Sequence, residues 1–120
     1  MHFNNMFTRS LLALFVLTLV LSVAAMDTPA VDDRNDAWIS VSTMIKFIGM
    51  GDASSVDRAG NDALGSLEKA VDKEQDSSKK DKLIDAKTKV REALGQASRG
   101  EWPYAEGAAK KALELIESVK

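Results

Sequence analysis

The stretch that decides the fold is GEWPYAEGAAKKAL, residues Gly100 to Leu113. Gly100 suits the left-handed position that follows a helix end, and Pro103 suits the first turn of the next helix. Alanines then recur at the 3.6-residue spacing of one helix face, namely Ala105, Ala108 and Ala112. The stretch therefore predicts a helix end, a tight turn and a returning helix.

A second stretch of the same kind, GDASSVDRAGNDAL, begins 49 residues earlier at Gly51. Aligned from their glycines, the two stretches place acid on acid, alanine on alanine twice, and leucine on leucine. The alignment indicates two helical hairpins of related sequence.

The 3.6-residue period predicts four helices, over residues 33–48, 54–74, 79–98 and from Pro103 to the C-terminus. Ser54 with Asp57, and Ser78 with Asp81, have the spacing of helix-start signals. A polar segment, residues 73–82, connects the second helix to the third. No stretch alternates as a strand would, so we expect an all-α fold, a small up-down four-helix bundle made of two helical hairpins.

The N-terminal segment has the three parts of a secretory signal peptide. A basic start precedes an apolar run, residues 11–23, and small residues at Ala24 and Ala25 offer a cleavage site. We expect residues 1–25 to be removed and residues 26–120 to form one helical-bundle domain in the periplasm or outside the cell. An uncleaved membrane tether is the alternative, although the run is shorter than the roughly 20 residues that span a bilayer.

Two residue types that carry much protein chemistry are missing after this segment. The chain has no cysteine, and its one histidine is His2. This excludes histidine-based acid–base catalysis, the Ser-His-Asp and Cys-His nucleophile arrangements, and the usual ligands of zinc and copper. The formal net charge of −2, without a basic stripe, argues against nucleic acid as a partner. We therefore expect no enzymatic activity, no catalytic residue and no required cofactor.

The first predicted helix has more apolar side chains than one helix of a bundle needs. Its segment AWISVSTMIKFIGM, residues 37–50, contains a single charge, Lys46. A helix that is apolar nearly all round is buried or contacts something. Its large side chains are therefore either deep core or a contact surface for an envelope protein, a second copy of the chain or, weakly, a membrane. The candidates are Trp38, Ile39, Met44, Phe47 and Met50.

Two aromatic residues on either side of Pro103 are further candidates for partner binding. Trp102 and Tyr104 are of the type that anchors many protein interfaces. The alternative for Trp102 is a structural role at the N′ position, where it would pack onto the helix that it precedes.

Two known families share parts of this layout. Residues Gly100 to Leu115 resemble one helix and turn of a tetratricopeptide repeat, but two hairpins 49 residues apart do not make a solenoid. The whole layout resembles the small metal-binding proteins of the bacterial periplasm, with a signal peptide and a glycine before each return helix. That family places histidines directly after the turn glycine and about two turns on. This chain has Asp52 and Glu101, then Ala59 and Ala108, at those places.

Two hypotheses about function follow. The residues themselves favour an exported, non-enzymatic, small helical-bundle protein that acts by binding a protein partner or by self-association. The family resemblance implies the alternative, a periplasmic protein that binds a divalent metal through carboxylates such as Asp52 and Glu101 in place of imidazole.

Overall fold

The computed structural model describes residues 32–119, and within them the chain forms four helices and no strand. The predicted signal peptide, with its cleavage site at Ala24 and Ala25, lies outside the described residues. The first helix covers residues 32–50, and it is followed by α2 (Ala53–Lys73), α3 (Ser77–Ser98) and α4 (Trp102–Glu117). The predicted all-α four-helix bundle is confirmed.

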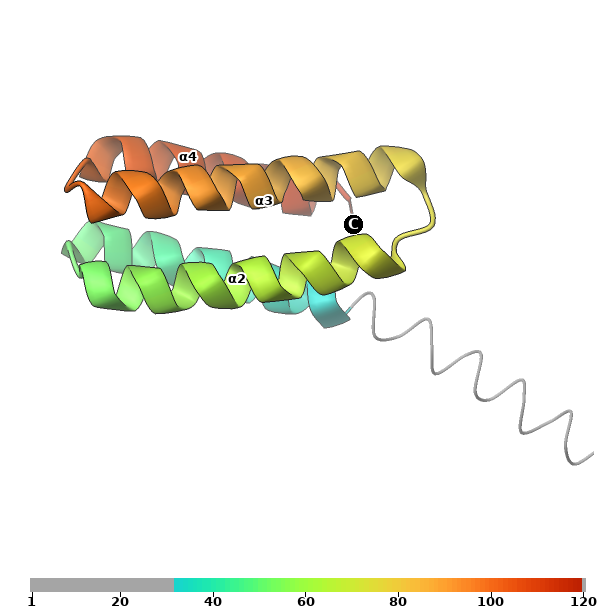
Figure 1. Cartoon of the computed structure of the whole chain (residues 1–120), viewed down its shortest axis with the longest axis horizontal. Coiled ribbons are helices and arrows are strands. Elements are labelled where there is room, and N and C mark those ends of the chain that lie inside the picture. The colour runs from blue at the N-terminus through green and yellow to red at the C-terminus, as the bar shows by residue number, and fades with distance from the viewer. Residues whose placement is uncertain (1–31, 120) are drawn as a thin grey trace, which may run out of the picture.

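The helices form two hairpins that lie against each other (Figure 1). Hairpin 1 is the first helix with α2, and hairpin 2 is α3 with α4. Both hairpin turns lie at one end of the bundle, and the link between α2 and α3 lies at the other (Figure 1). None of the helices in the described part of the chain combines the length and the apolar character needed to cross a membrane.

The two hairpin turns have the same backbone structure. Gly51 and Gly100 adopt left-handed φ angles of 66° and 73°. The glycine N–H donates to the carbonyl three residues back, and the next N–H donates to the carbonyl five residues back, at 2.9–3.1 Å in both turns. This is the Schellman pattern, which satisfies carbonyls left free at a helix end. The turn that the glycines predicted is therefore formed twice.

The predicted helix-start signals are wrong in detail. The N-cap of α2 is Asp52, whose side chain accepts from the backbone N–H of Ser55 at 3.2 Å. The N-cap of α3 is Asp76, whose carboxylate accepts from the N–H of Lys79 at 3.0 Å. In both helices the N-cap therefore lies two residues before the predicted serine, because an aspartate there accepts the hydrogen bond from the first turn. The link between the hairpins is correspondingly short, residues 74–76.

Alanine dominates the core. It supplies eleven of the twenty buried hydrophobic residues in the described part of the chain, and no polar or charged residue there is buried. Small side chains bring helices close together, and a few larger ones fill the centre. The largest fully buried side chains are Met44, Leu67, Leu83 and Ile116.

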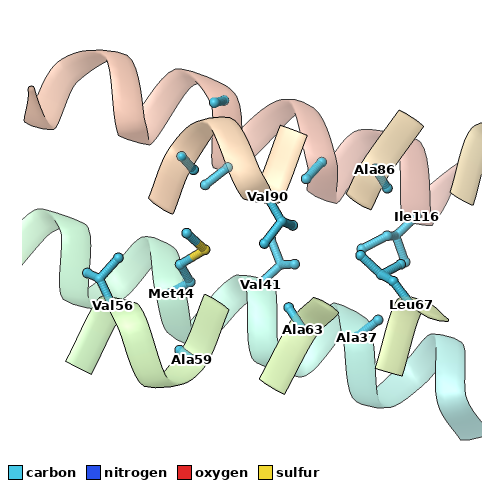
Figure 2. Close-up of a cluster of buried hydrophobic side chains, with 14 of the residues drawn as sticks. Ala37, Val41, Met44, Val56, Ala59, Ala63, Leu67, Ala86, Val90 and Ile116 are labelled. Atoms are coloured by element: carbon cyan, nitrogen blue, oxygen red, sulfur yellow. The ribbon is translucent and has the colours of Figure 1, made fainter. Parts of the chain in front are cut away.

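The core repeats with the 49-residue offset seen in the sequence. Every buried position in hairpin 1 has a buried counterpart in hairpin 2. The pairs are Ala37/Ala86, Val41/Val90, Met44/Ala93, Ile48/Ala97, Val56/Ala105, Ala59/Ala108, Gly60/Ala109, Ala63/Ala112, Leu67/Ile116 and Ala70/Val119. Counterparts meet across the core, since Val41 points toward Val90 and Leu67 toward Ile116 (Figure 2). The bundle is thus two copies of one hairpin plan related by an approximate two-fold axis.

One buried pair differs in a way that shapes the contact between α2 and α3. At Gly60, an added Cβ would lie 2.8 Å from Cγ of Leu94, so a side chain there would overlap with the leucine. The glycine lets Leu94 sit directly on the backbone of α2. Its counterpart Ala109 carries a methyl group, so the two hairpins contact each other differently on the two sides of the bundle.

Polar contacts between the first helix and α4 close the bundle. The Arg34 guanidinium donates to the backbone oxygen of Val119 at 2.8 Å, and the Trp38 indole N–H donates to Glu117 at 3.0 Å. Within hairpin 1, Lys73 donates to Asp33 at 2.8 Å. The first helix is therefore held by both α2 and α4.

Candidate functional site

The structure separates the seven predicted contact residues into four groups. Met44 is fully buried and is one of the largest side chains in the core. Including it in a contact surface is therefore wrong, because its position on the inner stripe places it at the centre of the bundle (Figure 2). The other six are half-buried or exposed.

Trp38 has an internal role. It is half-buried against the core, and its indole N–H donates a hydrogen bond to Glu117 of α4. A tryptophan with its ring packed and its one donor satisfied within the chain stabilises the contact between helices. Trp38 therefore connects the first helix to α4.

Four predicted residues gather at the end of the bundle that carries the hairpin turns. We call them the turn-end patch: Phe47, Met50, Trp102 and Tyr104. Met50 is 65% exposed and Tyr104 is 71% exposed, whereas Phe47 and Trp102 pack partly against the core. Trp102 lies over the turn of the other hairpin, since a Cβ added at Gly51 would be 3.9 Å from its ring atom Cε2. The patch thus combines the end of the first helix with the start of α4.

The predicted N′ position of Trp102 is wrong by two positions, because Trp102 is the first residue of α4. Its N-cap is Glu101, whose side chain makes no capping hydrogen bond. The structural part of that prediction is nevertheless close, since the indole packs against the core. The ring of Trp102 also lies close to Gly51 of hairpin 1.

The counterpart of the turn-end patch, 49 residues away for each member, is polar or small. Phe47, Met50, Trp102 and Tyr104 correspond to Gln96, Arg99, Ala53 and Ser55. Ser55 is occupied with capping, since its hydroxyl donates to Asp52 at 2.7 Å. Two corners of the same backbone plan therefore differ sharply, and one of them exposes large apolar side chains.

Ile39 lies apart from the patch, on the outer face of hairpin 1. It is 57% exposed and lines a shallow groove between the first helix and α2. We call this the hairpin-1 groove; its other lining residues include Asp36, Asn61, Asp62, Gly65 and Lys69. Sequence reasoning missed the α2 residues of this groove. The available signal was Gly65, a glycine within a helix and off its apolar stripe.

Asp52 and Glu101, the predicted metal ligands, are each engaged within their own turn. Both oxygens of Asp52 accept from Ser55, and these hydrogen bonds, first from the side chain and then from the backbone, lower the pKa of that carboxyl from its ordinary value of 3.8. Glu101 pairs with Arg99 at 3.1 Å. Residues 32–119 hold no group of three or more His, Cys, Asp or Glu side chains placed to bind a metal ion. The donor set therefore does not fit a divalent metal site.

Comparison with known proteins gave no match to a family model, to a curated protein or to a solved structure. The resemblance to the small metal-binding proteins stays a prediction about layout. The functional argument therefore rests on the surface of this molecule.

Proposed function

We propose that this is a non-enzymatic, exported protein that acts by binding another protein through the turn-end patch. The observation that carries the proposal is the exposure of Met50 next to the turn over which Trp102 of the other hairpin lies, at a corner whose counterpart is polar. Methionine, tryptophan and tyrosine are residue types enriched at the centre of protein interfaces. Isolated exposed apolar residues are ordinary, but Met50 ends the first helix one residue before Gly51, the point where Trp102 of the other hairpin lies close.

The sequence lacks residue types that often carry out catalysis, and this supports a binding role. The chain has no cysteine and no histidine beyond His2. Where a pKa shift is resolved, it is that of Asp52, whose pKa is lowered. The hydrogen bonds that Asp52 accepts as the N-cap of α2 account for this shift. A perturbed pKa explained by a structural role gives no indication of catalysis. The signal-like segment 1–25 supports a partner in the periplasm or outside the cell.

The first test places a photo-crosslinking amino acid at Met50 or at Arg99, its counterpart, in the protein expressed in its own host. We expect one defined protein adduct from position 50 and none of the same mass from position 99. Equal adducts at both positions, or none at position 50, would rule out the patch as the contact surface. The comparison is matched, because both positions directly precede the Schellman glycine of a hairpin turn.

The second test measures affinity for the crosslinked protein after it has been purified. Met50→Ala and Tyr104→Ala are expected to weaken binding by about tenfold or more each, as interface anchors do. Arg99→Ala serves as the control and is expected to bind as the wild type does. Circular dichroism checks that each variant keeps its helices, which is expected because both substituted side chains are mostly exposed.

A further inference from the structure

Each hairpin has an outer face that points away from the shared core. The side chains on these two outer faces differ. In hairpin 2, the face is covered by ion pairs: Lys110 with Glu106 at 2.7 Å, Lys111 with Glu114 at 3.4 Å, and Lys89 with Glu92 at 3.1 Å. Such pairs along helices are typical of a surface that stays in water. Hairpin 1 has the groove with Ile39 and Gly65 at the corresponding place.

Most residues of the hairpin-1 groove are replaced by another residue type in hairpin 2. Ile39, Asp62 and Gly65 correspond to Thr88, Lys111 and Glu114. Two small residues of the groove, Ser40 and Gly65, thus stand where hairpin 2 has the long polar residues Lys89 and Glu114. The backbone plan is the same, so the fold alone does not require a groove here.

Gly65 is the least expected residue of the groove. It lies within α2, it is exposed, and an added Cβ would meet nothing within 4 Å. A glycine at an exposed helix position is less favourable than alanine, and inside this chain no close contact requires it. Gly60, by contrast, is required by Leu94. The open surface over Gly65 is suited to the close approach of another molecule.

We propose that the hairpin-1 groove binds a second copy of this chain in a two-fold symmetric dimer. The charges on α2 suit such an arrangement, since Asp62 and Lys69 are seven residues apart, about 10 Å along the helix. Gly65 and Ser66 lie at the midpoint between them. Two α2 helices crossing antiparallel at this midpoint bring each Lys69 to the Asp62 of the other copy. The interface is isologous, because one patch carries both halves of each pair.

Ile39 lies at the same level as this midpoint. The Lys73–Asp33 and Arg34–Glu74 ion pairs fix the antiparallel register of hairpin 1, and this register puts Ile39 beside α2 near Gly65 and Ser66. In the dimer the two Ile39 side chains flank the two-fold axis and lose contact with water. Among the described residues, Asp62 and Lys69 form no ion pair within the chain, so both are available to the second copy.

The test is the oligomeric state of protein expressed from the full sequence and purified as its host processes it. Sedimentation equilibrium is expected to show a reversible monomer–dimer equilibrium. Asp62→Lys and Lys69→Asp, each alone, place like charges opposite each other and are expected to weaken the dimer by about tenfold or more. The double variant restores both pairs and is expected to recover dimerisation. Mixing the two single variants is expected to give a heterodimer.

Glycine substitutions separate an effect on dimerisation from an effect on the stability of the fold. Gly65→Ala and Gly107→Ala both add a methyl group at an exposed helix position with open space around it. Both are expected to raise the thermal midpoint, but Gly65→Ala alone is expected to weaken the dimer. Lys111→Asp, at the counterpart of Asp62, is the charge control and is expected to leave the dimer unchanged.

Three results would overturn the proposal: a monomer at all concentrations, open-ended growth in mass, or a dimer that is insensitive to both charge reversals. Because the groove and the turn-end patch share no residue, the two proposals fail separately. The crosslink from Met50 is expected to persist in Asp62→Lys, and the dimer is expected to persist in Tyr104→Ala.

Discussion

Hairpin 1 and hairpin 2 bury side chains at the same positions but expose different side chains to solvent. Their turns share the Schellman hydrogen bonds, and their buried positions coincide at an offset of 49 residues. Their outer faces differ at corresponding positions, since hairpin 1 has a groove lined by Ile39 and Gly65 where hairpin 2 has the ion pairs of Lys110 and Lys111. The fold constrains the interior of both copies, so the difference between them is the place to look for function.

The largest expected effect tests whether the two hairpins contribute equally to the core. Leu67→Ala and Ile116→Ala, at counterpart positions, are each expected to lower the free energy of unfolding by about 2–5 kcal/mol, measured by urea denaturation. The side chains meet across the core (Figure 2), so the double variant is expected to cost less than the sum. A small loss at one position and a large loss at the other would contradict the shared core.

A smaller effect is expected where the symmetry of the core is broken. Gly60→Ala places a methyl group against Leu94, which is expected to cost about 1–3 kcal/mol even though alanine favours the helix. Adding Leu94→Ala is expected to remove most of that overlap penalty. The matched change, Ala109→Gly, is expected to cost about 1 kcal/mol through helix propensity. If Gly60→Ala were stabilising, the close contact between α2 and α3 would be disproved.

The two turns are expected to respond alike. Gly51→Ala and Gly100→Ala force a side chain into a left-handed conformation, at about 1–2 kcal/mol each. Thermal unfolding followed by circular dichroism measures the loss. Gly49→Ala is the control, because its added methyl group meets nothing and its position is helical; it is expected to be neutral or stabilising. Unequal losses at Gly51 and Gly100 would mean that the contact of Trp102 with one turn matters.

The smallest expected effect is a difference in acid sensitivity between the two turns. The pKa of Asp52 is lowered in the folded protein by its hydrogen bonds to Ser55. Its ionised form therefore adds stability above the ordinary value of 3.8, and that contribution is lost as the pH falls through the lower, folded value. Asp52→Asn is expected to lose less stability than the wild type between pH 7 and pH 3. Glu101→Gln, which lacks a capping bond to remove, is expected to behave as the wild type; equal behaviour of both variants would contradict the assigned cause.

Much of the fold was predictable because its signals are local. Turn glycines, a proline in a first turn and the spacing of alanines each depend on a few neighbouring residues, and they predicted four helices and two hairpins. The helix starts were predicted one or two residues late, because aspartate and serine accept the same hydrogen bond and only the backbone path shows which one does so.

The candidate sites depended on information that is not local. The sequence by itself determined that large apolar residues crowd the first helix, that Trp102 and Tyr104 flank a turn, and that histidine and cysteine are missing. Only the tertiary structure decided that Met44 is core, that Trp38 pairs with Glu117, and that the end of the first helix and the start of α4 lie at the same end of the bundle. Exposure and adjacency depend on how the two hairpins pack together. A 3.6-residue period shows which side chains share one helix face, but it does not show which faces meet.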